Sequence, residues 1–215
     1  MGQIGRVGQV GRVGSALSLF VALAATLLAQ DAAVGRVRAW RAQHEPQILR
    51  ELFDLLAIPN VASNAVDIER NAQALTRMFE KRRFLPETIP TGGAPLVVAE
   101  RRVPDAHRTV TFYFHYDGQP VDAREWTHAP PFSPVIVADL ASGGRAMKLD
   151  EVRGAIDPEW RVFGRSSSDD KSPIVAFLAL SMVNFDNNQH GPNENLRIKN
   201  LWEGIDSMAA LLTMR

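Results

Sequence analysis

The chain has 215 residues, a length that suits one domain or one and a half. Its 24 lysines and arginines equal its 24 aspartates and glutamates, so no excess of charge argues for nucleic acid or another polyanion as a partner. The absence of cysteine excludes thiolate catalysis, disulfides and cysteine-held zinc, and leaves His, Asp and Glu as the side chains able to hold a metal.

Residues 1–29 have the pattern of an export signal. A basic lead with Arg6 and Arg12 precedes the apolar run ALSLFVALAATLLAQ, which contains several small residues near its end. The run is shorter than the about twenty residues that a membrane span needs. We therefore predict an exported protein, periplasmic or secreted, that is cleaved after Ala29. An uncleaved anchor and a misassigned start codon are the alternatives.

Two amphipathic helices and a hairpin are expected next. Large apolar residues recur at helical spacing between residues 34 and 56, and Pro59 follows the end of that pattern. Residues 67–83 repeat the helical spacing. The sequence RFLPETIPTGGAPLVVAERR then predicts two strands around a turn at Gly92 and Gly93.

The remainder of the chain alternates strands with helices. Strands are expected at residues 108–117, 159–165 and 196–204, and the first of these is apolar enough to favour a central position. Helices are expected at residues 172–185 and 206–215. This order predicts an α/β fold, a three-layer sandwich around a mixed, mostly parallel sheet, without a second domain.

The stretch TVTFYFHYDGQP, residues 109–120, ends an alternating strand on polar side chains. His115 and Asp117 are two positions apart, so in a strand both point to the same face. A single His at a strand end is more often packed or solvated than a ligand, whereas a neighbouring carboxylate is the usual partner of a metal-binding His. Spacing alone leaves both interpretations open.

The stretch GRSSSDDKSP, residues 164–173, follows a predicted strand and opens a predicted helix. In open α/β sheets this edge is where ligands bind, and Asp169 and Asp170 lie there side by side before Lys171. However, acids near a helix start are stabilised by about 0.3–1 kcal/mol without any ligand. Taken by itself, the motif favours that structural explanation.

In combination, these motifs resemble the co-catalytic zinc metallopeptidases, the family of aminoacylases, carnosinases and glutamate-carboxypeptidase-like dipeptidases. The resemblance runs from about residue 34 to 204 and rests on FHYDGQPVD, EWTHAPPFSPVI, EWRVFGRSSSDDKSPIVAFLAL and LRIKNLWEG. It implies that residues 34–215 are the amino-terminal portion of a phosphorylase/hydrolase-like catalytic domain. The lid or dimerisation domain and the carboxyl-terminal part would be absent.

The resemblance also implies a role for each motif. His115 would be a terminal ligand of one metal, Asp169 would bridge two metals, and Asp117 would orient His115. Zinc is the expected metal, with two ions in a complete site and manganese or cobalt as alternatives. The implied reaction is hydrolysis of an amide or peptide bond in a small peptide or N-acyl amino acid. A homodimer is implied for full-length relatives.

The chain departs from the family pattern after Gly204. Where the family has Glu-Gly-x-Glu-Glu, this chain has EGIDS, so Asp206 stands in the place of the general base and Ser207 in that of a metal ligand. An Asp base is one methylene shorter, and a 1 Å misplacement can cost about a hundredfold in rate. We therefore expect a truncated hydrolase that is weak or inactive alone. The alternatives are a non-catalytic relative acting as a binding module and an α/β domain without metal.

Overall fold

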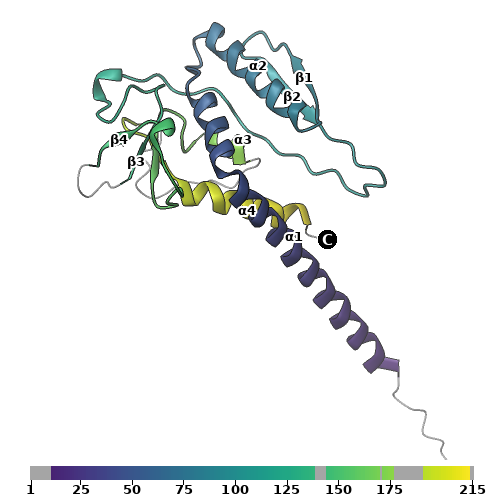
Figure 1. Cartoon of the computed structure of the whole chain (residues 1–215). Helices are drawn as coiled ribbons and strands as arrows, with labels where there is room; N and C mark the ends of the chain where they lie inside the picture. Colours follow the sequence, from purple (N-terminus) through teal and green to yellow (C-terminus); the bar gives the residue numbers. More distant parts are fainter. Residues whose placement is uncertain (1–10, 139–143, 170, 177–190, 214–215) are drawn as a thin grey trace, which may run out of the picture.

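The structure is a computed structural model that describes residues 11–138, 144–169, 171–176 and 191–213. In these ranges α-helices and two sheets form one body, from which the first part of α1 (Gly11–Leu56) extends as a long helix (Figure 1). No helix among these residues is long and apolar enough to cross a membrane. The predicted export signal stays a prediction, since residues 1–10 lie outside the described ranges.

The two predicted helices are confirmed. The interval 34–56 forms the second half of α1, and α2 (Ala65–Lys81) begins after the N-cap Asn64, whose side chain accepts a hydrogen bond of 3.2 Å from the Asp67 backbone. The last turns of α1 contribute these apolar residues to the core: Ile48, Leu49, Leu52, Phe53, Leu55 and Leu56. Trp40, which shares their spacing, is instead 52% exposed and stacks on His44.

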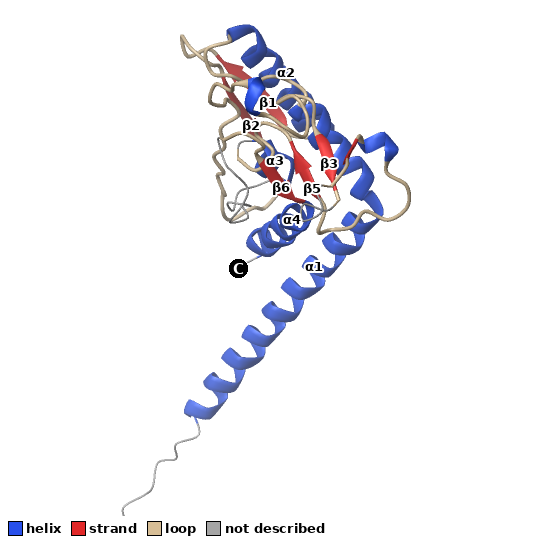
Figure 2. Cartoon of the chain, turned by 90° about the vertical axis from the view of Figure 1, so that its left-hand side faces the viewer, coloured by secondary structure: helices blue, strands red, loops and turns tan. Residues whose placement is uncertain are grey.

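The predicted hairpin is also confirmed. β1 (Leu85–Ile89) pairs antiparallel with β2 (Leu96–Glu100), and its turn contains Gly92 at φ +84°, a backbone region that favours glycine. Both strands pack against α2, as Figures 1 and 2 show. The hairpin and α2 thus form one local unit beside the carboxyl-terminal half of α1.

The second sheet has four strands in the order β4-β3-β5-β6 (Figure 2). Its strands are β3 (Val135–Val137), β4 (Ala146–Met147), β5 (Arg161–Phe163) and β6 (Asn195–Arg197). Ile136, Val162 and Leu196 align across it and are fully buried in the core shared with the helices. The other elements are the short helices η1 (Ala123–Glu125), η2 (Leu149–Glu151) and α3 (Lys171–Ala176), and the longer α4 (Ile198–Thr213).

The chain mixes helices and strands as predicted, but the mostly parallel three-layer sandwich is not confirmed. Every strand pairing within the two described sheets is antiparallel. The parallel contact in the described ranges is an isolated bridge between Val61 and Gly118. A periodic pattern in the sequence predicts that a segment is a helix or a strand. Whether two strands pair parallel or antiparallel depends instead on the path of the chain that connects them.

The predicted central strand at residues 108–117 is wrong, because this segment belongs to neither sheet. Its alternation is nevertheless present, since Phe112, Phe114 and Tyr116 are half-buried while Tyr113 is 81% exposed. Alternation decides which side chains are buried, but a strand also needs a neighbour with a free edge. The sequence pattern does not specify that neighbour.

The predicted strand at residues 196–204 is wrong beyond Arg197, where α4 begins. Ile198, Leu201 and Trp202 are buried at helical spacing, and α4 packs against α1. The predicted final helix is therefore the second half of α4. The predicted strand at 159–165 is confirmed as β5, and the helix expected at 172–185 begins as α3, although residues 177–185 lie outside the described ranges.

Candidate metal site

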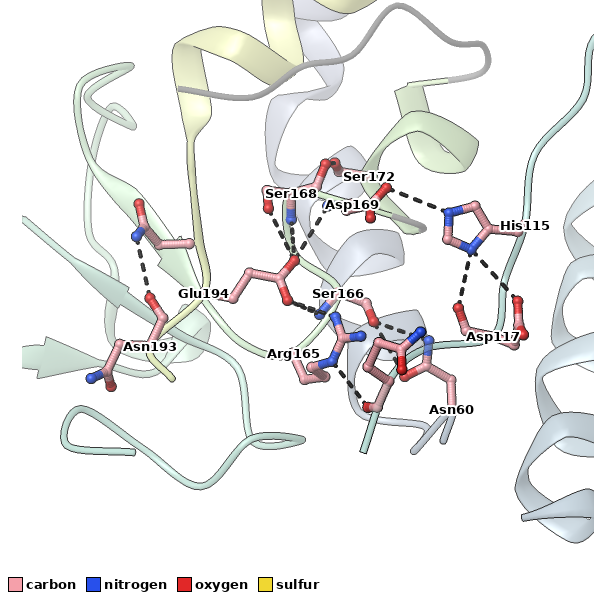
Figure 3. Close-up of polar contacts among 12 residues, drawn as sticks. Asn60, His115, Asp117, Arg165, Ser166, Ser168, Asp169, Ser172, Asn193 and Glu194 are labelled. Carbon is pink, nitrogen blue, oxygen red and sulfur yellow. Dashed lines mark hydrogen bonds and ion pairs between the residues drawn. The ribbon is translucent and has the colours of Figure 1, made fainter. Parts of the chain in front are cut away.

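His115, Asp117 and Asp169 lie together, although Asp169 comes from a distant part of the sequence (Figure 3). Nε2 of His115 is 3.5 Å from Oδ1 of Asp169. Nδ1 of the same ring is 3.5 Å from Oδ1 of Asp117 and 3.2 Å from the Asp117 backbone oxygen. The side chains of His115 and Asp117 are 44% exposed and that of Asp169 is 21% exposed, so a small ligand can reach them from solvent.

The spacing between His115 and Asp169 suits two ligands of one cation. A normal N–H···O hydrogen bond measures about 2.7–3.2 Å, which is shorter than the observed separation. Two ligands of a tetrahedral zinc, each about 2.0–2.2 Å from the ion, lie about 3.4 Å apart. The two oxygens of Asp117 near Nδ1 favour a proton on that nitrogen, which turns the lone pair of Nε2 toward Asp169.

This donor set fits part of a metal site. An imidazole nitrogen and a carboxylate oxygen suit zinc, manganese or cobalt, and Asp117 stands where a carboxylate orients a metal-binding imidazole. Within the residues that the structure describes, no group of three or more His, Asp or Glu side chains gathers to hold an ion. His115 and Asp169 could therefore hold an ion with water in its remaining positions.

Asn60 joins the two chain segments that carry the site. Its Nδ2 donates to the backbone oxygen of Tyr116 and to Oγ of Ser166, both at 3.0 Å. Its backbone oxygen accepts from the N–H of Gly118 at 2.7 Å. Because Asn60 is fully buried, water does not compete for these bonds. The segment with His115 is thus held against the loop with Asp169, a link that no sequence pattern predicts.

Glu194 holds the loop that ends in Asp169. This fully buried carboxylate accepts hydrogen bonds from the backbone N–H groups of Ser166, Ser168 and Asp169 at 3.0, 3.2 and 3.3 Å. It also forms a buried ion pair of 2.7 Å with Arg165. No sequence pattern distinguishes Glu194, because an acid in the polar stretch NNQHGPNEN resembles any solvated side chain.

Lys171 anchors the other end of this loop. Its buried ammonium donates to the backbone oxygens of Leu55 and Ile58 at 2.7 and 2.6 Å. Leu55 lies in the last turn of α1 and Ile58 follows two residues after its end, so the ammonium sits where the helix dipole favours a cation. Lys171 is therefore a structural support of the loop.

Tyr116 is fixed beside the site by its own polar contacts. Its hydroxyl donates to the backbone oxygen of Pro95. Burial, together with the negative charges of Asp117 and Glu69, raises the pKa of this phenol above its usual value. Tyr116 therefore stays protonated at neutral pH, which allows it to keep its hydroxyl as a donor.

The structure does not bring Asp206 to the other three predicted site residues. Asp206 lies on α4, where its Oδ2 accepts from Nε of Arg38 on α1 at 2.7 Å. Oγ of Ser207 donates to the backbone oxygen of Glu203 at 2.8 Å, a bond within the same helix. None of the contacts described for either residue reaches His115 or Asp169.

Comparison with known proteins supports the fold. No protein-family model and no curated protein matches the chain. The structure resembles the dipeptidase Dug1p from Saccharomyces cerevisiae, with a TM-score of 0.51 and 17% identity over 81% of this chain and 31% of that one. It also resembles the M20 family metallo-carboxypeptidase Sso-CP2 from Sulfolobus solfataricus, with a TM-score of 0.46 and 29% identity over 60% of this chain and 25% of that one. The chain thus spans less than a third of either protein, and it shares its fold with part of a peptidase.

Proposed function

We propose that this chain is part of a metal-dependent hydrolase that cleaves an amide or peptide bond of a small substrate, with His115 and Asp169 as metal ligands. The observation that carries the proposal is the approach of Nε2 of His115 to Oδ1 of Asp169 at 3.5 Å. The likeness in fold to a dipeptidase supports it. Because the chain covers 31% of that dipeptidase, the substrate and activity of a whole protein are part of this proposal.

Zinc is the metal that we propose for the site, with manganese or cobalt as alternatives. A metal ion bound there would lower the pKa of a water molecule to about 7 and polarise a substrate carbonyl. His115 and Asp169 bind the ion, while Asp117 orients the imidazole and keeps its proton on Nδ1. The exposure of the site suits a small peptide or N-acyl amino acid as substrate.

The test is a calorimetric zinc titration of the wild type and of the variants His115→Ala and Asp169→Asn. We expect a site in the wild type and a loss of affinity of at least about tenfold in each variant, because each loses a protein ligand. The matched control is His44→Ala, which removes a histidine that stacks on Trp40 of α1. Zinc affinity that is equal in the wild type and His115→Ala would refute the proposed ligands.

A non-catalytic binding module is the second candidate. It is favoured by the position of Asp206, whose carboxylate pairs with Arg38, and by the hydroxyl of Ser207, which bonds within α4. Neither residue supplies a base or a third ligand beside His115 and Asp169. Hydrolysis of a panel of dipeptides and N-acyl amino acids by the zinc-loaded protein separates the two functions. Activity that His115→Ala abolishes supports the hydrolase, whereas zinc binding without turnover supports the module.

A further inference from the structure

We infer that Glu194 is a positioning residue that sets the place of Asp169 relative to His115. The inference rests on the proposed metal site and adds to it a residue that touches neither of the proposed ligand atoms. Glu194 acts instead through the backbone of the loop formed by residues 165–169, which Figure 3 shows wrapped around its carboxylate.

Both oxygens of the Glu194 carboxylate are used. Oε1 accepts from the backbone N–H and the hydroxyl of Ser168, at 3.2 and 3.0 Å, and from the backbone N–H of Asp169 at 3.3 Å. Oε2 accepts from Nη1 of Arg165 at 2.7 Å and from the backbone N–H of Ser166 at 3.0 Å. Because the N–H of Asp169 itself is among the donors, a shift of this carboxylate displaces the backbone that carries the proposed ligand.

The loop needs this support because its backbone is not in a relaxed conformation. Ser166 has φ +66°, a left-handed conformation that residues other than glycine adopt rarely. Such a conformation persists where surrounding contacts determine it. Here those contacts come from Glu194 and from Asn60, whose side chain exchanges hydrogen bonds with the Ser166 hydroxyl.

A carboxylate of this length is the group that matches these donors. Glutamine at position 194 would offer one acceptor oxygen and would turn an NH₂ group toward donors of the loop. Aspartate would keep the charge opposite Arg165, but its carboxylate would fall short by about 1.5 Å, the length of one C–C bond. Since Glu194 is fully buried, bulk water does not replace a missing acceptor.

The experiment compares Glu194→Gln and Glu194→Asp with the wild type and with Glu100→Gln, which removes an exposed carboxylate of β2. Hydrogen exchange of a peptide that covers residues 164–169 reports the loop without any metal. A chelator-competition titration reports zinc affinity. We expect faster exchange of this peptide and a loss of zinc affinity of about 10–100-fold in both Glu194 variants. The control exchanges and binds like the wild type.

Addition of formate to Glu194→Ala provides a rescue that a general loss of stability would not show. The cavity left by the side chain and the loop donors around it should accept this small carboxylate, so formate restores slow exchange at residues 164–169 while chloride does not. If Glu194→Gln fails to fold, the measurements on Glu194→Asp, which keeps a negative charge opposite Arg165, test the inference.

The outcomes separate this inference from the proposed function. Absence of zinc binding in the wild type would refute the metal site, while faster exchange at residues 164–169 in a folded Glu194 variant would still support the positioning role. Wild-type exchange and wild-type zinc affinity in a folded variant would overturn the inference and leave the metal site standing.

Discussion

The imidazole of His115 faces an acidic side chain on each of its two nitrogens. On one side it meets the carboxylate and backbone oxygen of Asp117, and on the other the carboxylate of Asp169. Under our proposal these two neighbours differ in function. Asp117 orients the ring, whereas Asp169 binds the same metal ion as His115. The distinction can be tested one residue at a time.

Replacement of Asp117 by Ala should weaken zinc binding without abolishing it. Loss of a carboxylate that orients a metal-binding His typically reduces affinity by about 10–100-fold. We expect a loss near tenfold and smaller than that of His115→Ala, because the backbone oxygen of residue 117 remains 3.2 Å from Nδ1. Chelator competition measures the change, with Asp122→Ala as the control at an exposed carboxylate. A loss as large as that of His115→Ala would mean that Asp117 is itself a ligand.

Among the helices and strands, α1 is the support to which α2 and α4 are attached. Glu51 of α1 pairs with Lys81 at 3.0 Å and with Arg82 at the end of α2. Burial raises the pKa of Glu51, but the hydrogen bonds and charges of Arg82 and Lys81 outweigh it and leave the pKa below its usual value of 4.5. Glu51 is therefore a carboxylate that stabilises the fold in its charged form.

The stabilisation by Glu51 should depend on pH. Because its pKa is lower in the folded than in the unfolded chain, the contribution is fully present above the unfolded pKa and is lost as the pH falls through the folded pKa. Urea unfolding of the wild type and Glu51→Gln, followed from pH 7 to pH 3, measures it. We expect the wild type to be the more stable at pH 7, and the difference to shrink below about pH 4.5. A difference that stays constant with pH would contradict this account.

α4 occupies sequence that we predicted to be a strand up to residue 204. In a strand Ile198 and Leu201 would point to opposite faces, whereas in α4, which packs against α1 and α3, both are fully buried. We therefore expect Leu201→Ala to lower the free energy of unfolding by about 2–5 kcal/mol. Leu212→Ala, at a residue of α4 that is 52% exposed, should change it by about 0.5 kcal/mol or less. Equal effects in urea unfolding would contradict the helical packing.

In the molecule as a whole, sequence patterns predicted the elements whose partners are close in the chain. The helix α2 and the hairpin of β1 and β2 contain their own signals, namely amphipathic spacing in the helix and a turn at Gly92 and Gly93 in the hairpin. Residues 108–117 and 196–204 were assigned wrongly because their conformation depends on distant neighbours. An alternating segment needs a strand beside it, and an apolar segment after β6 becomes a helix because α1 provides the surface on which it packs.

The candidate site shows the same limit. Periodicity and spacing did not decide between a metal site and ordinary polar residues at His115 and Asp169, and the expectation that they meet came from a family resemblance. No sequence pattern singled out Asn60 or Glu194 as supports of the site. Both act through hydrogen bonds in the protein interior, and their burial becomes apparent only in the folded chain. The antiparallel pairing of the strands and the position of Asp206 also depend on long-range packing, which the sequence patterns do not specify.

The most direct test of the metal site is anomalous X-ray diffraction from crystals of the protein soaked in zinc. The account predicts a zinc peak between the two segments, about 2.0–2.2 Å from both Nε2 of His115 and a carboxylate oxygen of Asp169. The peak should be absent from crystals of His115→Ala treated in the same way. Zinc bound at other residues, or no zinc between His115 and Asp169, would contradict the account.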